Sequence, residues 1–183
     1  LCGESLYARI ERTGSLQTGE LIRLGIELCR IMNYLHSFKP NPILYLDLHP
    51  GNLLICREQL KLIDFDQAAL ASLSQERSVC YGTKGFAAPE QYEGGTLDER
   101  TDIYAIGALL YYMGTGHAPE GEIKAGQGSC RGDLYILMGR CLRIEKKERC
   151  QSVREVLEAL EKLEARIFAE RHIPLLRIAA AGS

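Results

Sequence analysis

The chain has 183 residues, 46% of them hydrophobic, and a formal net charge of −2. This length and composition predict one globular domain with a core of its own, and the small net charge gives no electrostatic reason to expect nucleic acid or an anionic membrane as a partner. No apolar run reaches the roughly 20 residues that span a bilayer. Because the chain begins with Leu1 and shows no signal peptide, we expect it to be a piece of a longer protein.

The cysteines are odd in number, scattered, and never spaced as a C-x-x-C pair. This pattern favours reduced thiols in a cytoplasmic protein over a disulfide framework or a zinc site. They are Cys2, Cys29, Cys56, Cys80, Cys130, Cys141 and Cys150.

Two helices are predicted in the first forty residues. Residues 5–11 are expected to form a short one. Thr18 is expected to cap the second, in which apolar residues recur every three or four positions up to Leu35. That spacing predicts a largely buried helix. We expect His36, near its end, to interact with the helix dipole rather than to act as a ligand.

Residues 45–66 hold polar side chains between runs that are expected to be buried. The apolar runs 53–55 and 60–63 predict a β-hairpin. A hairpin returns the chain to its starting point, so the polar residues on both sides should gather at one end, in a set of oxygen ligands of the kind that Mg²⁺ prefers. The alternative is that these residues only shape turns. They are Asp47, His49 and Asn52 before the hairpin, and Asp64 and Asp66 after it.

The second half of the chain is predicted to be mainly helical. Residues 101–113 are apolar on nearly every face, which predicts a helix inside the core. Residues 119–132 are expected to form a surface loop, and residues 133–142 a helix. Ser152 and Glu155 have the spacing of a capping box that opens a last amphipathic helix. For residues 173–183 we favour a frayed end over the first strand of a further domain.

The order Asp47, five residues, Asn52, a strand pair and then Asp64 resembles the catalytic loop and metal-binding motif of protein kinases. Gly82 and Thr83, followed by Ala-Pro-Glu at residues 88–90, resemble the end of a kinase activation segment. The resemblance implies a mainly α fold with a small β-hairpin, the C-lobe of a serine/threonine protein kinase, over residues 1–172. The catalytic loop would be residues 45–52, the metal-binding motif 64–66, and the activation segment 64–90.

The resemblance also implies roles for single residues. Asp47 would accept the proton of the substrate hydroxyl, and His49, at the place of a kinase lysine, would donate to the γ-phosphate of ATP. Asn52 and Asp64 would hold Mg²⁺, and with Leu54 they would contact ATP. Thr83 would face Asp47, which favours serine or threonine as the acceptor in a protein substrate.

Three further residues are expected to support the site. Asp102 would hold the catalytic loop through backbone hydrogen bonds, and Glu90 and Arg149 would form a buried ion pair. The chain departs from the kinase pattern at Leu46, where an arginine is usual, and at Asp66, where a glycine is usual.

The kinase N-lobe has no counterpart here, since no G-x-G-x-x-G loop is present. We therefore expect the N-lobe of the same protein to be a partner of this chain, and the chain alone to bind ATP weakly and to transfer no phosphate. Two other functions stay open. The Asp-x-His of residues 47–49 also resembles aminoglycoside and choline phosphotransferases, whose acceptor is a small molecule. A pseudokinase-like scaffold that only binds partners is the second alternative.

Overall fold

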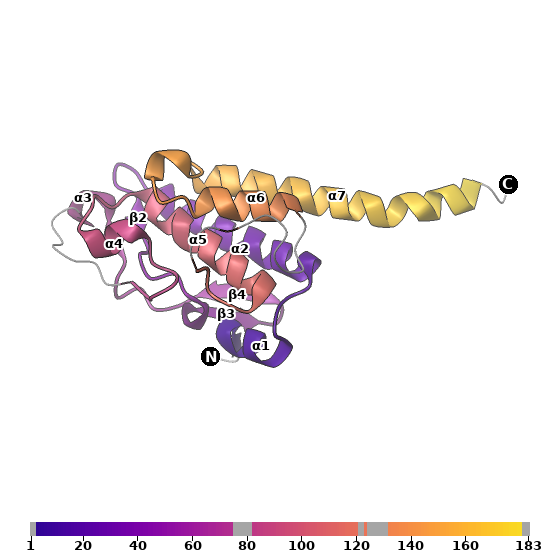
Figure 1. Cartoon of the computed structure of the whole chain (residues 1–183), viewed down its shortest axis with the longest axis horizontal. Helices are drawn as coiled ribbons and strands as arrows, with labels where there is room; N and C mark the ends of the chain where they lie inside the picture. The colour runs from indigo at the N-terminus through magenta and orange to yellow at the C-terminus, as the bar shows by residue number, and fades with distance from the viewer. Residues whose placement is uncertain (1–2, 75–81, 121–122, 124–131, 181–183) are drawn as a thin grey trace.

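A computed structural model describes residues 3–74, 82–120, 123 and 132–180 (Figure 1). The predicted class, mainly α with a small β-hairpin, is confirmed. The helices are α1 (Leu6–Thr13), α2 (Thr18–His36), α3 (Ala71–Ser74), α4 (Pro89–Glu93), α5 (Glu99–Thr115), α6 (Gly132–Cys141) and α7 (Val153–Ala180), with the short turns η1 (Pro50–Asn52) and η2 (Lys146–Glu148). The strands are β1 (Glu4–Ser5), β2 (Ile43–Leu44), β3 (Leu53–Cys56), β4 (Gln59–Leu62) and β5 (Ala69–Leu70).

The core lies between α2, α5 and α7. Helix α2 packs against both of the others, and its buried stripe runs from Leu21 to Leu35 as its spacing predicts. Gly25 lets the three helices approach, because a Cβ there would lie 2.7 Å from the Leu110 side chain and 3.2 Å from that of Leu160. Helix α5 is buried along almost its whole length, so it forms the central support of the fold.

The predicted hairpin is formed by β3 and β4, with Leu53 opposite Leu62 and Cys56 opposite Gln59. Its two turn residues, Arg57 and Glu58, both have positive φ, as a tight hairpin turn with the twist of its strands requires. Strand β1 pairs with the other edge of β3. A separate pair, β2 with β5, joins the chain before residue 45 to the chain after residue 66.

Some local predictions were wrong in detail. Helix α2 already includes Thr18, so Gln17 occupies the N-cap position and makes no side-chain cap. At the start of α7, Ser152 Oγ accepts from the Glu155 amide, but the Glu155 carboxylate accepts from the amide of Gln151 instead of that of Ser152. After residue 172 the backbone continues as helix α7 to Ala180, and is neither a strand nor an irregular end over that range (Figure 1).

Several predictions fall partly outside the described residues. These include the activation segment at 75–81, most of the loop at 119–132 and the last residues, 181–183. Among the described cysteines, Cys29, Cys56, Cys141 and Cys150 are free and buried. In the same described part of the chain, no helix is both long enough and apolar enough to cross a membrane.

Gly116, which caps the end of α5, should not tolerate alanine. Its φ is +80°, and a Cβ there would lie 2.1 Å from the carbonyl oxygen of Gly14 at the end of α1. Gly116→Ala should lower the free energy of unfolding by more than the about 1–2 kcal/mol that a left-handed backbone costs an L-residue. Gly139→Ala is the control, because that helical position has open space, and it should stabilise by about 0.5–1 kcal/mol. Urea unfolding of both variants gives the comparison.

Candidate active site

The hairpin brings the predicted polar residues to one end. The Ile63 amide donates to the Asn52 carbonyl at 3.0 Å, so Asp64, the next residue, starts beside Asn52. The Asn52 side-chain amide in turn donates to the Asp47 carbonyl at 3.1 Å and lies 3.4 Å from its carboxylate. Asn52 therefore contacts Asp47 and lies beside the residue that precedes Asp64, which brings together residues from opposite sides of the hairpin.

Tyr45 joins the two halves of this site. Its hydroxyl lies 2.5 and 2.6 Å from the carbonyl oxygens of Ile63 and Asp64, to which it can donate, and its ring packs edge-on against Phe65. Burial, followed by the negative charges of Asp47 and Asp64, raises the pKa of the Tyr45 phenol. Tyr45 thus stays a neutral donor and links the residues around Asp64 to the segment that precedes Asp47.

Removing this hydroxyl should cost stability. Tyr45→Phe keeps the buried ring but leaves the two carbonyls without their donor, so the free energy of unfolding should fall by about 1 kcal/mol. Tyr34→Phe is the matched control, since Tyr34 is 64% exposed and should change stability by less than about 0.5 kcal/mol. Chemical unfolding that shows equal effects would exclude the proposed link.

His49 lies beside Asp47. Its Nδ1 accepts from the Gly51 amide at 3.1 Å, which assigns the ring proton of a neutral imidazole to Nε2. That nitrogen lies 3.7 Å from the Asp47 carboxylate. His49 therefore presents an N–H donor on the same side as the Asp47 carboxylate.

Asp102, at the start of α5, holds the backbone before Asp47. Its two carboxylate oxygens accept from the amides of Tyr45 and Leu46, each at 2.9 Å. Leu46 has a φ of +67°, a strained conformation for leucine, which these bonds help to impose. His36 Nε2 lies 2.8 Å from the same carboxylate. The expectation for His36 was therefore incomplete: besides lying at the end of α2, it is a hydrogen-bond partner of Asp102.

The segment after residue 81 returns to the site through Thr83 and Gln91. Thr83 Oγ1 donates to the Asp47 carboxylate at 2.9 Å. Gln91, in α4, donates to the Leu46 carbonyl at 2.8 Å and accepts from the Ala88 amide. A Cβ at Gly82 would lie 2.4 Å from that of Ala87, so only glycine fits there. Sequence reasoning missed Gln91, although its place three residues after a helix cap was a signal.

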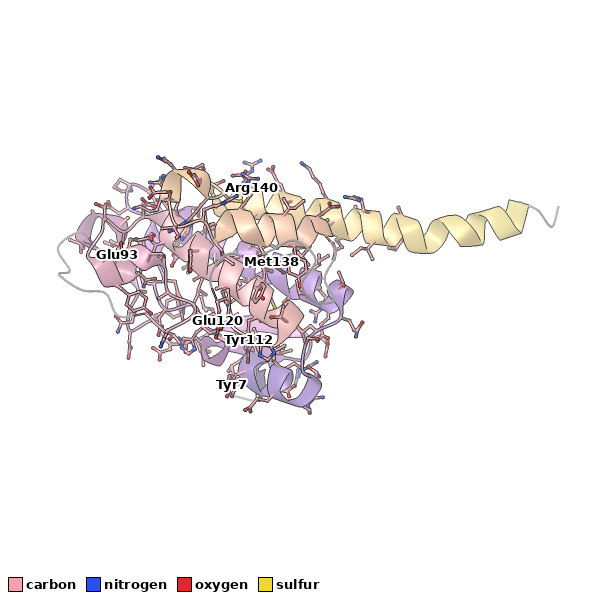
Figure 2. All side chains as sticks on the ribbon, viewed as in Figure 1. Tyr7, Glu93, Tyr112, Glu120, Met138 and Arg140 are labelled. Carbon is pink, nitrogen blue, oxygen red and sulfur yellow. The ribbon has the colours of Figure 1, made fainter. Side chains whose placement is uncertain are left out.

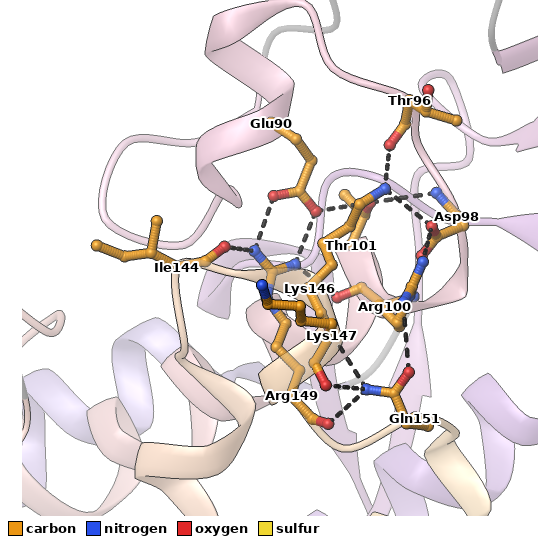
Figure 3. Close-up of polar contacts among 10 residues, drawn as sticks. All are labelled: Glu90, Thr96, Asp98, Arg100, Thr101, Ile144, Lys146, Lys147, Arg149 and Gln151. Carbon is orange, nitrogen blue, oxygen red and sulfur yellow. Dashed lines mark hydrogen bonds and ion pairs between the residues drawn. The ribbon is translucent and has the colours of Figure 1, made fainter.

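Glu90 and Arg149 form the buried ion pair that the sequence predicted (Figure 3). The two side chains meet in a bidentate arrangement, at 2.7 and 2.8 Å. The other Arg149 donors reach the carbonyls of Arg100, Arg143 and Ile144, so all five N–H groups are satisfied. Burial by itself would raise the pKa of Glu90, but the hydrogen bonds and the charge of Arg149, together with the hydrogen bond from Thr101, outweigh burial and lower that pKa.

The sequence of this chain is similar to those of known proteins. Residues 1–172 match the protein kinase domain. The chain belongs to the protein kinase family. Its place among serine/threonine kinases, bacterial ones included, is confirmed by relatives from several organisms.

Three relatives illustrate the range of identity and coverage. Integrin-linked protein kinase 1 of Arabidopsis thaliana is 33% identical over 119 residues, which is 61% of this chain and 25% of the relative. Serine/threonine-protein kinase A of Synechocystis sp. is 29% identical over 179 residues, 84% of this chain and 34% of the relative. A DNA damage-responsive serine/threonine-protein kinase of Deinococcus radiodurans is 35% identical over 116 residues, which is 60% of this chain and 17% of the relative. The matched part of the chain thus spans about a third or less of the length of these kinases.

Where kinases usually have an arginine, this chain has the apolar residue Leu46. Leu46 is buried with Leu44 and Leu97, and the partly buried Ala69 and Ala71 pack against them. These residues join the segment before Asp47 to β5 and to the loop before α5. Packing therefore occupies the place where an arginine would meet a phosphorylated activation segment.

Two side-chain oxygens at this site remain available as metal ligands, and they suit Mg²⁺ bound to a nucleotide. Because the Asn52 amide nitrogen is engaged by Asp47, its side-chain oxygen is available as a ligand. Asp64 uses one carboxylate oxygen to accept from the Asp66 amide at 3.2 Å, which leaves the other. No cluster of three or more His, Cys, Asp or Glu ligands occurs within the described residues. Magnesium held by two protein oxygens takes its other ligands from phosphates and water.

Leu54 lies half-buried in the middle of β3, between Ser5 of β1 and Lys61 of β4. Its neighbours on the strand, Leu53 and Ile55, are buried in the core. Since side chains alternate along a strand, Leu54 is directed to the opposite face of the sheet from these core residues.

Proposed function

We propose that this chain is the C-lobe half of a serine/threonine protein kinase that transfers the γ-phosphate of ATP to a protein hydroxyl. The observation that supports this most is the position of Thr83, whose hydroxyl donates to the Asp47 carboxylate at 2.9 Å. A substrate hydroxyl in the place of the Thr83 hydroxyl would find the same acceptor. Asp47 would then orient the attacking oxygen and receive its proton.

In this proposal Asn52 and Asp64 provide oxygens to Mg²⁺, and Leu54 contacts the nucleotide. Bound Mg²⁺ neutralises charge on the phosphates of ATP. His49 directs its Nε2–H toward the γ-phosphate, next to Asp47. Asp102, Tyr45 and Gln91 hold the loop in place, so the contribution of the chain is positioning and electrostatics.

The nucleotide site would need a second lobe. Helices α1 and α2 and the two-residue strand β1 are the elements of the described part before residue 43, and no glycine-rich loop is present in the sequence. We infer that an N-lobe of the same protein completes the cleft, that the 183-residue chain alone transfers no phosphate, and that the protein is cytoplasmic, as its scattered cysteines suggest.

The test is transfer of labelled phosphate from Mg²⁺-ATP by a protein that includes the residues before Leu1. Protein acceptors with serine or threonine should be labelled, and the 183-residue chain alone should label nothing. Labelling of an aminoglycoside or choline instead would support the small-molecule phosphotransferase, which the Asp47-x-His49 spacing favours. Failure to bind Mg²⁺-ATP at all would favour a scaffold.

A further inference from the structure

Two buried thiols meet where the end of α6 lies against the start of α7. Cys141 is the last residue of α6, and its thiol donates to Cys150 Sγ, with the two sulfurs 3.9 Å apart. Both residues are fully buried. Figure 2 labels Arg140, the residue before Cys141, where α6 runs beside α7. Among the described residues, no other two cysteines make such a contact, and the proposed phosphate transfer does not use this one.

The contact makes the two thiols unequal. The hydrogen bond from Cys141 is the largest effect on Cys150, and with the positive charge of Arg140 it lowers the pKa of that thiol. Burial and the negative charge of Glu155 oppose this shift but do not cancel it. The same hydrogen bond, followed by burial and the neighbouring Cys150 and Cys29, raises the pKa of Cys141. Because the thiolate is the form that attacks an oxidant, Cys150 is the nucleophile of the pair.

The pair lies close beneath the surface. Cys150 is near Arg140 and Glu155, which form an ion pair with side chains 48% and 38% exposed. The next residues along the chain, Gln151 and Ser152, are exposed as well. An exposed ion pair contributes little to stability and opens readily, so a molecule as small as hydrogen peroxide can reach the Cys150 thiol while the helices stay packed.

We propose that Cys141 and Cys150 are a modification site, at which hydrogen peroxide forms a reversible disulfide. The Cys150 sulfur attacks one peroxide oxygen, the O–O bond breaks, and water leaves with the thiol proton, so that Cys150 becomes a sulfenic acid. The Cys141 sulfur then attacks the Cys150 sulfur. The S–S bond forms, the S–O bond breaks, and a second water leaves with the Cys141 proton. Two electrons pass from the thiols to the peroxide, and a reducing thiol reverses the bridge by exchange.

The bridge would close the segment that holds the buried ion pair. Arg149 directly precedes Cys150 and donates to the carbonyls of Arg143 and Ile144, which lie between the two cysteines (Figure 3). Forming an S–S bond of about 2.05 Å joins both ends of this segment and removes freedom from the unfolded chain. The disulfide should therefore brace Arg149 and, through Glu90, helix α4. This inference does not depend on the proposed function.

Peptide mapping tests the chemistry on the parent chain. The folded 183-residue chain is treated with hydrogen peroxide, its remaining thiols are blocked with N-ethylmaleimide, and it is digested with trypsin. Cleavage after arginine and lysine separates the two cysteines into peptides 141–143 and 150–154. These peptides should appear as one species, lighter by two hydrogen atoms than the sum of the reduced peptides, and dithiothreitol should separate them. Mass spectrometry measures both states.

Two variants complete the mapping experiment. Cys150→Ala should lose the cross-link and leave Cys141 as a free thiol. Cys56→Ala is the matched control, because Cys56 is a buried thiol of β3 that contacts none of the other described cysteines, and it should keep the cross-link. Recovery of both parent peptides as blocked thiols would overturn the proposal, as would a sulfinic acid without a bridge or a bridge from either cysteine to Cys29.

Urea unfolding tests the bracing role. The peroxide-treated parent should unfold at a higher urea concentration than the same sample after dithiothreitol. Cys56→Ala should show the same shift, and Cys150→Ala should show none. A midpoint of the oxidised parent equal to or below that of the reduced parent would overturn the assignment of the disulfide as a brace.

Discussion

Replacing Arg149 with methionine should lower the free energy of unfolding by about 3–5 kcal/mol. Methionine retains much of the apolar volume, but the Glu90 carboxylate would stay buried without its partner. The carbonyls of Arg100, Arg143 and Ile144 would also lose their donors. Chemical unfolding of the variant and the parent measures this difference.

Arg154→Ala is the control for this prediction. Arg154 also pairs with a glutamate, but its side chain is 77% exposed, and an exposed pair one helical turn apart contributes only about 0.3–0.5 kcal/mol. The double variant Glu90→Leu, Arg149→Met should recover part of the loss, because no charge is then stranded. Equal effects of Arg149→Met and Arg154→Ala would show that the buried pair does not stabilise the fold.

The effect of Arg149→Met should depend on pH. Glu90 has a lowered pKa in the folded parent. Its contribution to the free energy of unfolding is therefore complete at pH values above the ordinary pKa of 4.5, where the carboxylate is ionised in the unfolded chain as well. As the pH falls through and below that value toward the folded pKa, the unfolded state takes up a proton first and this stability is lost. The difference in unfolding free energy between parent and variant should therefore shrink on acidification.

Asp47→Asn should lower kcat by about 10²–10⁴-fold in a protein that includes the N-lobe. Asparagine can keep a hydrogen bond to the substrate hydroxyl but cannot take its proton. Binding of Mg²⁺-ATP should change little, because Asn52 and Asp64 remain. Steady-state kinetics with a serine peptide would separate the two effects.

Asp133→Asn is the control, since Asp133 is a half-exposed carboxylate of α6 that pairs with Arg166. Its kcat should match that of the parent. An Asp47→Asn enzyme with more than about a tenth of the parental kcat would contradict the assignment of Asp47 as the base, because general-base catalysis contributes more than that.

Much of the fold was predictable because its signals are local. The apolar spacing of α2, the continuous apolar run of α5 and the two short runs of the hairpin each bury a face that can be read from the sequence. The position of Asp64 next to Asn52 also follows from local structure, since a hairpin returns the chain to its start. The resemblance to kinases added the contact of Thr83 with Asp47, the supporting role of Asp102, and Arg149 as the partner of Glu90.

The contacts that sequence reasoning missed join residues far apart in the chain. The contact between His36 and Asp102 joins positions 66 apart, and that of Gln91 with the Leu46 carbonyl joins positions 45 apart. No spacing rule connects such residues, because their side chains meet only after the helices have packed. Residues 173–183 were expected to be a frayed end, whereas the helical backbone of α7 continues to Ala180.

The sequence by itself determined the elements, the polar residues at the hairpin end and the family to which they belong, because periodicity and motif spacing are properties of neighbours along the chain. Only the tertiary structure decided how those residues are held. The buried carboxylate of Asp102 fixes the strained backbone at Leu46, and Arg149 reaches the Glu90 carboxylate from a segment 59 residues away. Both arrangements depend on burial and on electrostatic partners from distant segments, which exist only once the core has formed.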